Sequence, residues 1–301
     1  MKNKYPKATG LLVIFAIYII AYVIGGFIVY LLRDTLTSTD WRLLIFSFVS
    51  TLIIWLGSSI LKNTSVYDPY WSLTPMVMMI YVVAINKEVI NAYHIVLFIV
   101  FLLWSLRLTI NWAYTFKNLE TEDYRYAKYR KEYNPFKFQL INLFGFMILP
   151  TMLGYLGLLP LIYLFSKTAS AWSLIGSIIV LIGFLLELFA DISGHKHLKE
   201  NKDVVNNKRL WKYSRHPKYL GEIFIWLGSY LSLLVSVPKL WYLGLGALLI
   251  VGLVEFILIP TSEEWLLKTV PNYEKYRQAT SRLLPLPKAI KIKAKTNKRT
   301  N

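Results

Sequence analysis

The 301-residue sequence contains no cysteine. Disulfide frameworks, thiolate nucleophiles and sites in which cysteine binds zinc or an iron–sulfur cluster are therefore excluded. Charged residues are also scarce at 17%, whereas hydrophobic residues make up 55% of the chain and the mean hydropathy is +0.45. Soluble domains contain about 25% charged residues. The composition therefore favours a protein whose solvent is lipid.

The apolar runs are long and do not alternate with polar residues, as the strands of a membrane barrel would. Because backbone groups in hydrocarbon must be satisfied within the spanning segment, such runs predict helices. The first run is too long for a signal-peptide core and lacks a small-x-small cleavage site, so we expect it to be retained. Runs of the ~20 residues needed to cross a bilayer lie near 11–32, 42–61, 92–114, 139–165, 171–190, 219–237 and 240–260.

A shorter run near 73–86 is either a span or a re-entrant segment, and the distribution of basic residues decides between them. With this run as a span, 28 of the 34 Lys and Arg residues lie on one side of the membrane and only five on the other. Because basic loops stay in the cytoplasm, both termini are then cytoplasmic. We predict an all-α, polytopic transmembrane helical bundle of about eight spans, located in a bacterial cell membrane.

The net charge of +17 does not by itself indicate a nucleic-acid partner. The basic residues lie mainly in loops beside the membrane, where anionic lipid head groups attract each by about 1 kcal/mol. We therefore expect anionic lipid head groups as partners and no nucleic acid. Residues 288–301 are polar and rich in lysine, so we predict a disordered basic tail after a single transmembrane domain over 1–287. The oligomeric state is left open.

The loop from Asp191 to Glu222, between the sixth and seventh spans, is dense in side chains that can bind ligands. Glu187 and Asp191 share a helix face, and His195 continues it if the helix persists. Carboxylates at membrane depth need a partner or a ligand, and pairing with a nearby Lys or Arg explains them equally well. His195 and His197 lack zinc-pair spacing and a third ligand, so no metal site is predicted.

Two arginines are further candidates. Arg215 precedes His216 and Pro217 at the start of the seventh helix, where its donors and the unpaired backbone N–H groups could bind phosphate. An interfacial anchor would explain this segment equally well. Arg107 lies far inside an apolar run with Asn111 one turn on, so it is a functional candidate, and a diphosphate or carboxylate partner would explain it.

Six segments of the chain form a combination that is specific although each piece alone is not. They are DPYWS at 68–72, RL at 107–108, EDYRY at 122–126, ELFAD at 187–191, LWKYSRHPKYLGE at 210–222 and EWLLKTVPNYEKY at 264–276. Together they resemble the DUF1295 family, which belongs with the steroid 5-alpha-reductase carboxy-terminal domain proteins, and the resemblance covers most of the chain.

The resemblance implies an intramembrane NADPH-dependent reductase of a carbon–carbon double bond conjugated to a carbonyl, acting on a lipid or steroid-like substrate from the bilayer. NADPH would deliver hydride to the β carbon while an acid polarises or protonates the enone oxygen. The cofactor-binding half would lie at about 138–287. The implied cofactor-binding residues are Arg107, Glu187, Asp191, His195, Tyr213, Arg215, His216, Lys218, Tyr219, Glu222, Glu264, Tyr273 and Tyr276.

The family usually has asparagine where this chain has Lys218, and a lysine can donate a hydrogen bond but cannot accept one. In the steroid reductases a glutamate and a tyrosine on early spans hold the substrate carbonyl. By this resemblance the catalytic candidates are Asp68, Tyr70 and Tyr114. For Tyr70, Trp71 and Trp104 a place in the interfacial aromatic belt is at least as compatible with the sequence.

Two other functions fit the same residues. The isoprenylcysteine carboxyl methyltransferases, which use S-adenosylmethionine, are similar in an Arg-His-Pro-x-Tyr-x-Gly string followed by a Glu and a Tyr-x-x-Tyr segment. The motifs around Asp68 and Glu122 favour the reductase. A non-catalytic lipid-binding or transport protein is the third possibility, and no inverted repeat supports transport.

Overall fold

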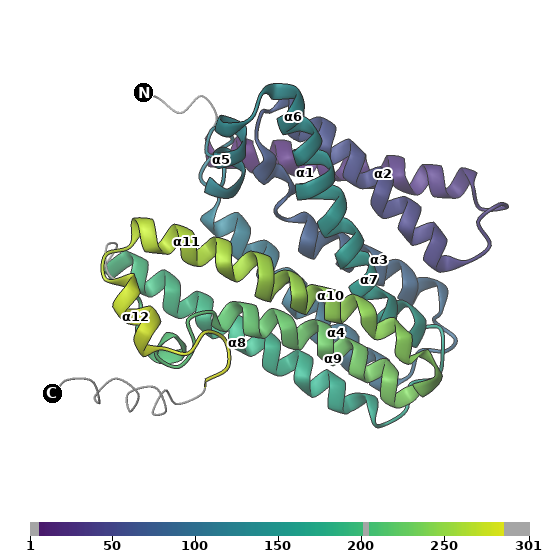
Figure 1. The fold of residues 1–301 in the computed structure, drawn as a ribbon. Coiled ribbons are helices and arrows are strands. Elements are labelled where there is room, and N and C mark those ends of the chain that lie inside the picture. The colour runs from purple at the N-terminus through teal and green to yellow at the C-terminus, as the bar shows by residue number, and fades with distance from the viewer. Residues whose placement is uncertain (1–5, 201–204, 286–301) are drawn as a thin grey trace, which may run out of the picture.

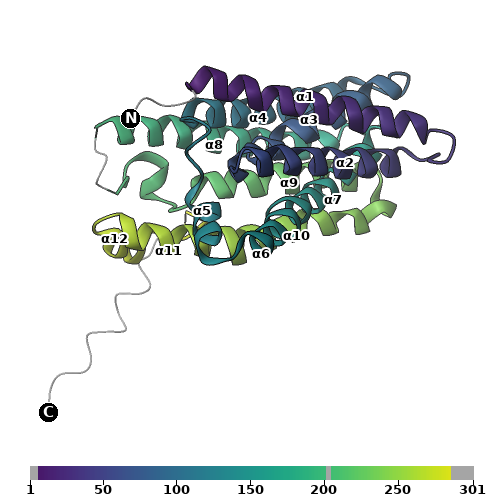
Figure 2. The ribbon, with the colours of Figure 1, turned by 90° about the horizontal axis from the view of Figure 1, so that it is seen from above.

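The computed structural model describes residues 6–200 and 205–285, and these form helices without a β-strand. The long helices lie side by side in an elongated bundle (Figure 1), and a view turned by 90° shows the same arrangement (Figure 2). The long elements are α1 (Lys7–Leu31), α2 (Thr39–Ile60), α3 (Tyr70–Ile85), α4 (Ala92–Thr115), α7 (Leu149–Leu164), α8 (Ser173–Glu200) and α9 (Pro217–Ser236).

Shorter elements connect or extend these helices. The remaining α-helices are α5 (Tyr124–Glu132), α6 (Pro135–Leu140), α10 (Leu245–Leu253), α11 (Ile259–Thr269) and α12 (Tyr273–Ala279). The segments η1 (Thr64–Tyr67), η3 (Arg209–Lys212) and η4 (Pro238–Gly244) are 3₁₀-helical. Two segments, η2 (Ile141–Ile148) and η5 (Val254–Leu258), are π-helical and lie inside continuous helices that run over 135–164 and 238–269.

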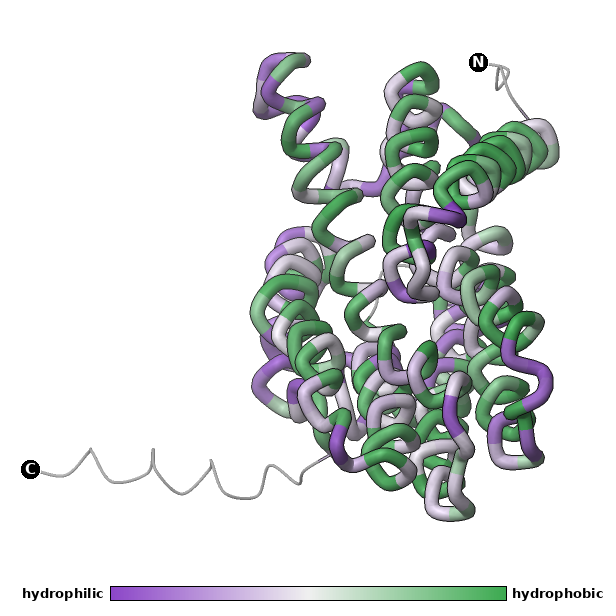
Figure 3. The backbone as a smooth tube through the Cα atoms, turned by 90° about the vertical axis from the view of Figure 1, so that its right-hand side faces the viewer, coloured by the Kyte–Doolittle hydropathy of each residue, from purple (hydrophilic) through white to green (hydrophobic). Residues whose placement is uncertain are grey.

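The structure confirms a polytopic helical membrane protein. Among the described residues seven continuous helices are long and apolar enough to cross a bilayer, and they match the seven predicted runs. Apolar residues occupy most of the length of these helices (Figure 3). The short eighth run forms α3, whose 16 residues span about 24 Å and pack against α4 and α7. About eight spans therefore account for the bundle.

Polar connections gather at the two ends of the bundle. The start of α1, the end of α8, α5 and α12 lie at one end in both views (Figures 1 and 2). We call this the basic end and define it by residues 116–134, 205–216 and 270–285. Eight crossings, as predicted from the charge count, place both ends of the chain and these connections on the same side of the membrane. That the basic end faces the cytoplasm stays a prediction.

Helices α8 and α9 make the most extensive contact of the bundle, and glycines permit it. A Cβ atom at Gly183 would lie 2.6 Å from the Gly221 carbonyl oxygen, and one at Gly228 would lie 2.8 Å from the Gly176 carbonyl oxygen. Small residues at seven-residue spacing on both helices thus let the two backbones touch, as in many membrane helix pairs. The close approach brings Glu187 of α8 beside the first turns of α9.

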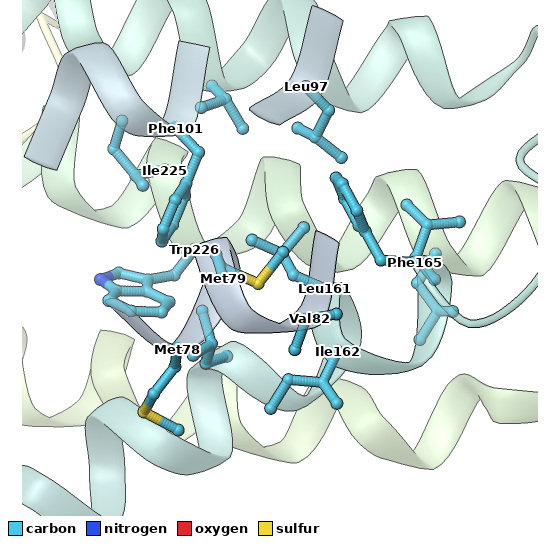
Figure 4. Packing of buried hydrophobic residues seen from close by; sticks show 14 of the residues in the cluster. Met78, Met79, Val82, Leu97, Phe101, Leu161, Ile162, Phe165, Ile225 and Trp226 are labelled. Carbon is cyan, nitrogen blue, oxygen red and sulfur yellow. The ribbon is translucent and has the colours of Figure 1, made fainter. Parts of the chain in front are cut away.

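The largest core cluster is formed by α3, α4, α7 and α9. Met79, Leu97 and Trp226 are almost completely buried in it, and Figure 4 shows them packed with Phe101 and Phe165. This core holds α3, α4, α7 and α9 together. The tail predicted over 288–301 lies outside the described residues, and the single-domain assignment over 1–287 stays a prediction.

Candidate functional site

A cavity of about 470 Å³ opens between α3, α4, α8, α9 and the two π-helical segments. We call it the inner cavity. Its volume lies within the range of about 300–1,000 Å³ that is usual for small-molecule sites. The charged side chains on its wall are Asp68, Arg107, Asp123, Arg125, Glu187, Asp191, Lys218 and Glu222.

Both π-helical segments contribute to this cavity. Phe146 of η2 and Val254 and Leu258 of η5 lie on its wall. A π-helical turn carries an extra residue in the helix; such turns are rare and frequently occur at functional sites. The two segments are far apart in sequence, so their convergence on one cavity is independent support for a functional site there.

A buried ion cluster crosses the cavity wall between α4 and α8. The guanidinium of Arg107 donates through its two terminal nitrogens to Asp191 and Glu187, and its side chain is only 9% exposed. Lys218, in the first turn of α9, pairs with the other oxygen of Asp191. Removing such charges from water is costly and yields little net stability, so their retention favours a functional role.

Glu222 is held by three tryptophans from three helices. The indole nitrogens of Trp71 and Trp226 donate to Glu222 Oε1 at 2.6 and 2.8 Å, and that of Trp104 donates to Oε2 at 3.3 Å. Because an indole N–H is a donor only, the carboxylate must accept all three bonds, which fixes its orientation. Trp104 is fully buried, so a place in the interfacial belt is wrong for it.

Carboxylates outnumber cations on the cavity wall. Five acidic side chains face three basic ones, and each of the three, Arg107, Arg125 and Lys218, already pairs with an acidic partner. The inner part of the wall therefore presents hydrogen-bond acceptors and negative charge. It suits ligand groups that donate hydrogen bonds or carry positive charge.

A second cluster lies where the cavity approaches the basic end. Tyr126 donates to Asp68 at 2.8 Å, and Arg125 pairs with Asp123 at 2.8 Å and lies 3.9 Å from Asp68. Burial raises the pKa of Asp68 to about 6, although Arg125 and the Tyr126 hydroxyl oppose this shift. Burial and the neighbouring Asp68 also raise the pKa of the Tyr126 hydroxyl. A carboxyl group with such a pKa can exchange protons near neutral pH, which keeps Asp68 a candidate for proton transfer.

Arg215 lies away from the inner cavity. Its guanidinium pairs with Glu263 at 2.9 Å and donates to the backbone carbonyls of Arg277 and Thr280. His216 also binds Glu263 at 2.9 Å. These contacts tie the start of α9 to α11 and to the end of α12. A cofactor contact of Arg215 or His216 stays a prediction, and the described side chains give both residues a structural role.

The other predicted cofactor residues divide between the cavity and the surface. Tyr219 lines the cavity and stacks on the His216 ring with centroids 5.6 Å apart. Tyr213 is 58% exposed on η3, and Glu264 faces outward and pairs with Lys268 at 2.5 Å.

The two tyrosines of α12, Tyr273 and Tyr276, are buried. Tyr276 donates to the Trp211 carbonyl at 2.6 Å, and Tyr273 is buried with a hydroxyl that has no hydrogen-bond partner among the described residues. Burial raises the pKa of Tyr273 to about 12. The two rings pack against each other and fix α12 to the rest of the basic end.

Of the three catalytic candidates, Asp68 lines the inner cavity, and Tyr70 and Tyr114 do not. Tyr70 is buried, stacks on Tyr67 and donates its hydroxyl to the Ser47 carbonyl at 2.7 Å. Tyr114 is 55% exposed on α4, and its ring lies 4.9 Å from that of His195. Helix α8 continues to Glu200, so His195 lies on it, as the face shared with Glu187 and Asp191 requires.

Sequence reasoning did not identify the tryptophan donors of Glu222 or the Glu263 partner of Arg215. Trp226 follows Glu222 by four residues, so the i,i+4 spacing could have indicated that pair. The glycine spacing over 176–183 and 221–228 could have indicated the close contact of α8 and α9. Trp71, Trp104 and Glu263 come from distant segments, and only tertiary structure brings them to their partners.

Comparison with known proteins identifies relatives without an assigned activity. The family model for DUF1295, described as a protein of unknown function, matches residues 54–282. An uncharacterized protein of Schizosaccharomyces pombe is 26% identical over 274 residues, which are 80% of this chain and 78% of the yeast protein. No solved structure matches. The match to the family covers every helix that lines the inner cavity.

Proposed function

The chain belongs to the DUF1295 family, and from this premise we propose that it is an intramembrane NADPH-dependent reductase of a carbon–carbon double bond conjugated to a carbonyl in a lipid or steroid-like substrate. The observation that carries the proposal is convergence. Segments 68–72, 107–108, 122–126, 187–191 and 218–222 are scattered over the sequence, and each contributes side chains to the inner cavity. The other segments of the resemblance, 210–217 and 264–276, stabilise the basic end beside it.

The wall of the cavity fits the two chemically different parts of NADPH. The nicotinamide carboxamide and the ribose hydroxyls are hydrogen-bond donors, and Glu187, Asp191 and Glu222 supply acceptors. The phosphates need positive charge, which Lys218 and Arg125 supply beside the amino terminus of α9. Pro217 occupies the first position of this helix, and no described side chain caps its N-terminus.

NADPH, when bound, supplies the hydride. The residues of the chain then hold the reactants, exclude water and move protons. Three indole donors keep Glu222 in one orientation, and the Arg107 pairs keep Glu187 and Asp191 fixed, so the binding groups are preorganised. We assign Asp68 as the proton source. With a pKa of about 6, roughly a tenth of the Asp68 carboxyl groups are protonated at pH 7.

Ligand-induced stabilisation tests the cofactor. NADPH at a hundredfold excess over its Kd should stabilise the purified protein by about 2.7 kcal/mol and raise its melting temperature. The same concentration of S-adenosylmethionine should have little effect. Lys218→Ala should reduce the shift, whereas the exposed Lys212→Ala in the preceding loop is the matched control and should not. A wild-type protein that NADPH leaves unchanged would contradict the proposal.

The excess of carboxylates favours a second candidate, a methyltransferase that uses S-adenosylmethionine. The sulfonium group of that cofactor carries a positive charge, and five acidic side chains surround the cavity. NADPH is an anion, and its phosphates would have to lie at Lys218 and Arg125. Stabilisation by S-adenosylmethionine alone, together with methyl transfer to a lipid acceptor, would replace the reductase with this function.

A further inference from the structure

A second depression lies on the lipid-facing surface between α4 and α8. Its volume is about 800 Å³, and we call it the α4/α8 groove. Its apolar floor consists of Leu103, Leu106, Ile110, Phe184, Leu188 and Ile192. On α4 the groove extends from Leu103 to Tyr114, which is about 17 Å along the helix. It therefore covers roughly half of the ~30 Å hydrocarbon thickness, on the side of the basic end.

The groove and the inner cavity share three residues. Arg107, Asn111 and Asp191 belong to the walls of both, so part of the groove wall is formed by the buried ion cluster. A ligand that lies in the groove can therefore present one end to the site at which the proposed chemistry takes place.

Two polar residues of α4, Arg107 and Asn111, lie among the apolar residues that line this groove. The side chain of Arg107 is 9% exposed, and its buried Nε atom has no hydrogen-bond partner among the described residues, although its terminal nitrogens bind Asp191 and Glu187. Asn111 Oδ1 lies 2.7 Å from His195 Nε2, which leaves the amide NH₂ of Asn111 as a donor for a ligand. An unpaired buried guanidinium donor is costly, so an acceptor group of a ligand placed against this part of the wall would be stabilising.

We propose that the α4/α8 groove binds a membrane-dissolved amphiphile with one elongated apolar body and a head group that accepts hydrogen bonds, a carbonyl or a carboxylate, at Arg107 and Asn111. Lys196, Lys199 and Glu200 also line the groove, with Lys196 3.8 Å from Glu200, and this excess of basic side chains favours a neutral or anionic head group over a cationic one. That this amphiphile is the substrate of the reductase rests on the proposed function. The binding site itself does not.

Photolabelling in phosphatidylcholine nanodiscs tests the groove. The probe is a palmitic acid that carries a diazirine in its chain, and the matched probe has a methyl group in place of the carboxyl group. We expect saturable labelling by the acid within 103–114 and 184–196, and at least tenfold weaker labelling of these segments by the hydrocarbon. Equal labelling by both probes would mean ordinary annular lipid and would overturn the proposal.

Two substitutions on the same helix separate the groove from the rest of the surface. Ile110 and Ile99 are both lipid-facing residues of α4, at 65% and 49% exposure, and only Ile110 lines the groove. Ile110→Trp should reduce labelling by the acid at least tenfold, and Ile99→Trp should leave it unchanged. Leu106→Trp provides a second groove variant if Ile110→Trp folds poorly. Unchanged labelling in a folded groove variant would refute the proposal.

The same samples distinguish this proposal from the reductase. Neither Ile110→Trp nor Ile99→Trp should alter stabilisation by NADPH, because neither residue lines the inner cavity. Selective labelling without any NADPH effect would leave the groove standing and refute the reductase. Stabilisation by NADPH without selective labelling would do the opposite.

Discussion

Replacing Arg215 with alanine tests whether this arginine holds the basic end together. The substitution removes an ion pair with Glu263 at 2.9 Å, in which the two side chains are 9% and 13% exposed. It also removes donors to the carbonyls of Arg277 and Thr280. Breaking a buried pair by removing one partner costs about 3–5 kcal/mol. Glu263 keeps His216 as a partner, so we expect a loss of about 3–4 kcal/mol.

The assay is the free energy of unfolding in detergent, measured for Arg215→Ala, Arg215→Lys and the exposed control Lys212→Ala. Lysine keeps the charge but cannot reach a carboxylate and two carbonyls with one ammonium group, so its loss should be intermediate. The control should change stability by less than about 0.5 kcal/mol. A double-mutant cycle with Glu263→Gln should show a strong coupling energy, since the two residues share one contact.

A phosphate ligand would behave differently. In that case Arg215→Ala would leave the free energy of unfolding nearly unchanged and would weaken NADPH binding ten- to a hundredfold, which corresponds to one charge-assisted contact. Our structural assignment predicts the reverse, with NADPH affinity retained by the protein that remains folded. Intact stability combined with lost affinity would falsify the assignment.

Three further predictions concern pH, packing and orientation. Because burial raises the pKa of Asp68 from 3.8 to about 6, its ionisation costs stability, which should fall as the pH rises from about 4 to 6. Affinity for the anionic NADPH should fall as the pH rises through about 6, and Asp68→Asn should remove both trends; trends that persist in this variant would assign them to another group. Gly183→Ala should destabilise the α8–α9 contact by about 1–3 kcal/mol in the same unfolding assay, whereas Gly26→Ala, with open space around its Cβ, should not; equal effects would contradict the close packing. Single cysteines at Lys87 or Lys167 should react with an impermeant maleimide in intact cells and one at Asn206 only after permeabilisation, and the absence of natural cysteine removes background labelling; reaction of Asn206 in intact cells would reverse the orientation.

The membrane-spanning helices were predictable because the bilayer fixes their length and apolar composition, which can be read along the sequence. A run of about 20 apolar residues must be a helix, and the charge of its flanks orders the crossings. The short α3 was recovered only through the distribution of basic residues, since 16 residues do not identify a span by length. The π-helical segments carry no such signal, because an extra residue in a turn leaves hydrophobicity unchanged.

The site was predictable where its residues share a helix face and not where they come from different helices. Glu187, Asp191 and His195 follow an i,i+4 pattern on α8, and the structure places them on this helix near the cavity or groove. Arg107 was a candidate because a charge inside an apolar run needs a partner, and its partners are the carboxylates of α8. The sequence could not separate the cavity-lining Lys218 from Arg215, three residues earlier, because the direction of each side chain depends on Asp191 and Glu263 in other segments.

The π-helical segment η2 sets the phase between the two halves of one membrane helix. Successive residues of an α-helix are about 100° apart, so deleting a single residue within 141–148 would turn one half relative to the other by about that angle and shift it by about 1.5 Å. Phe146 would then leave the cavity, or Thr151 would lose its hydrogen bonds to Thr51 and Tyr67. The extra residue in this turn lets one helix serve two partners whose positions no regular helix could satisfy together.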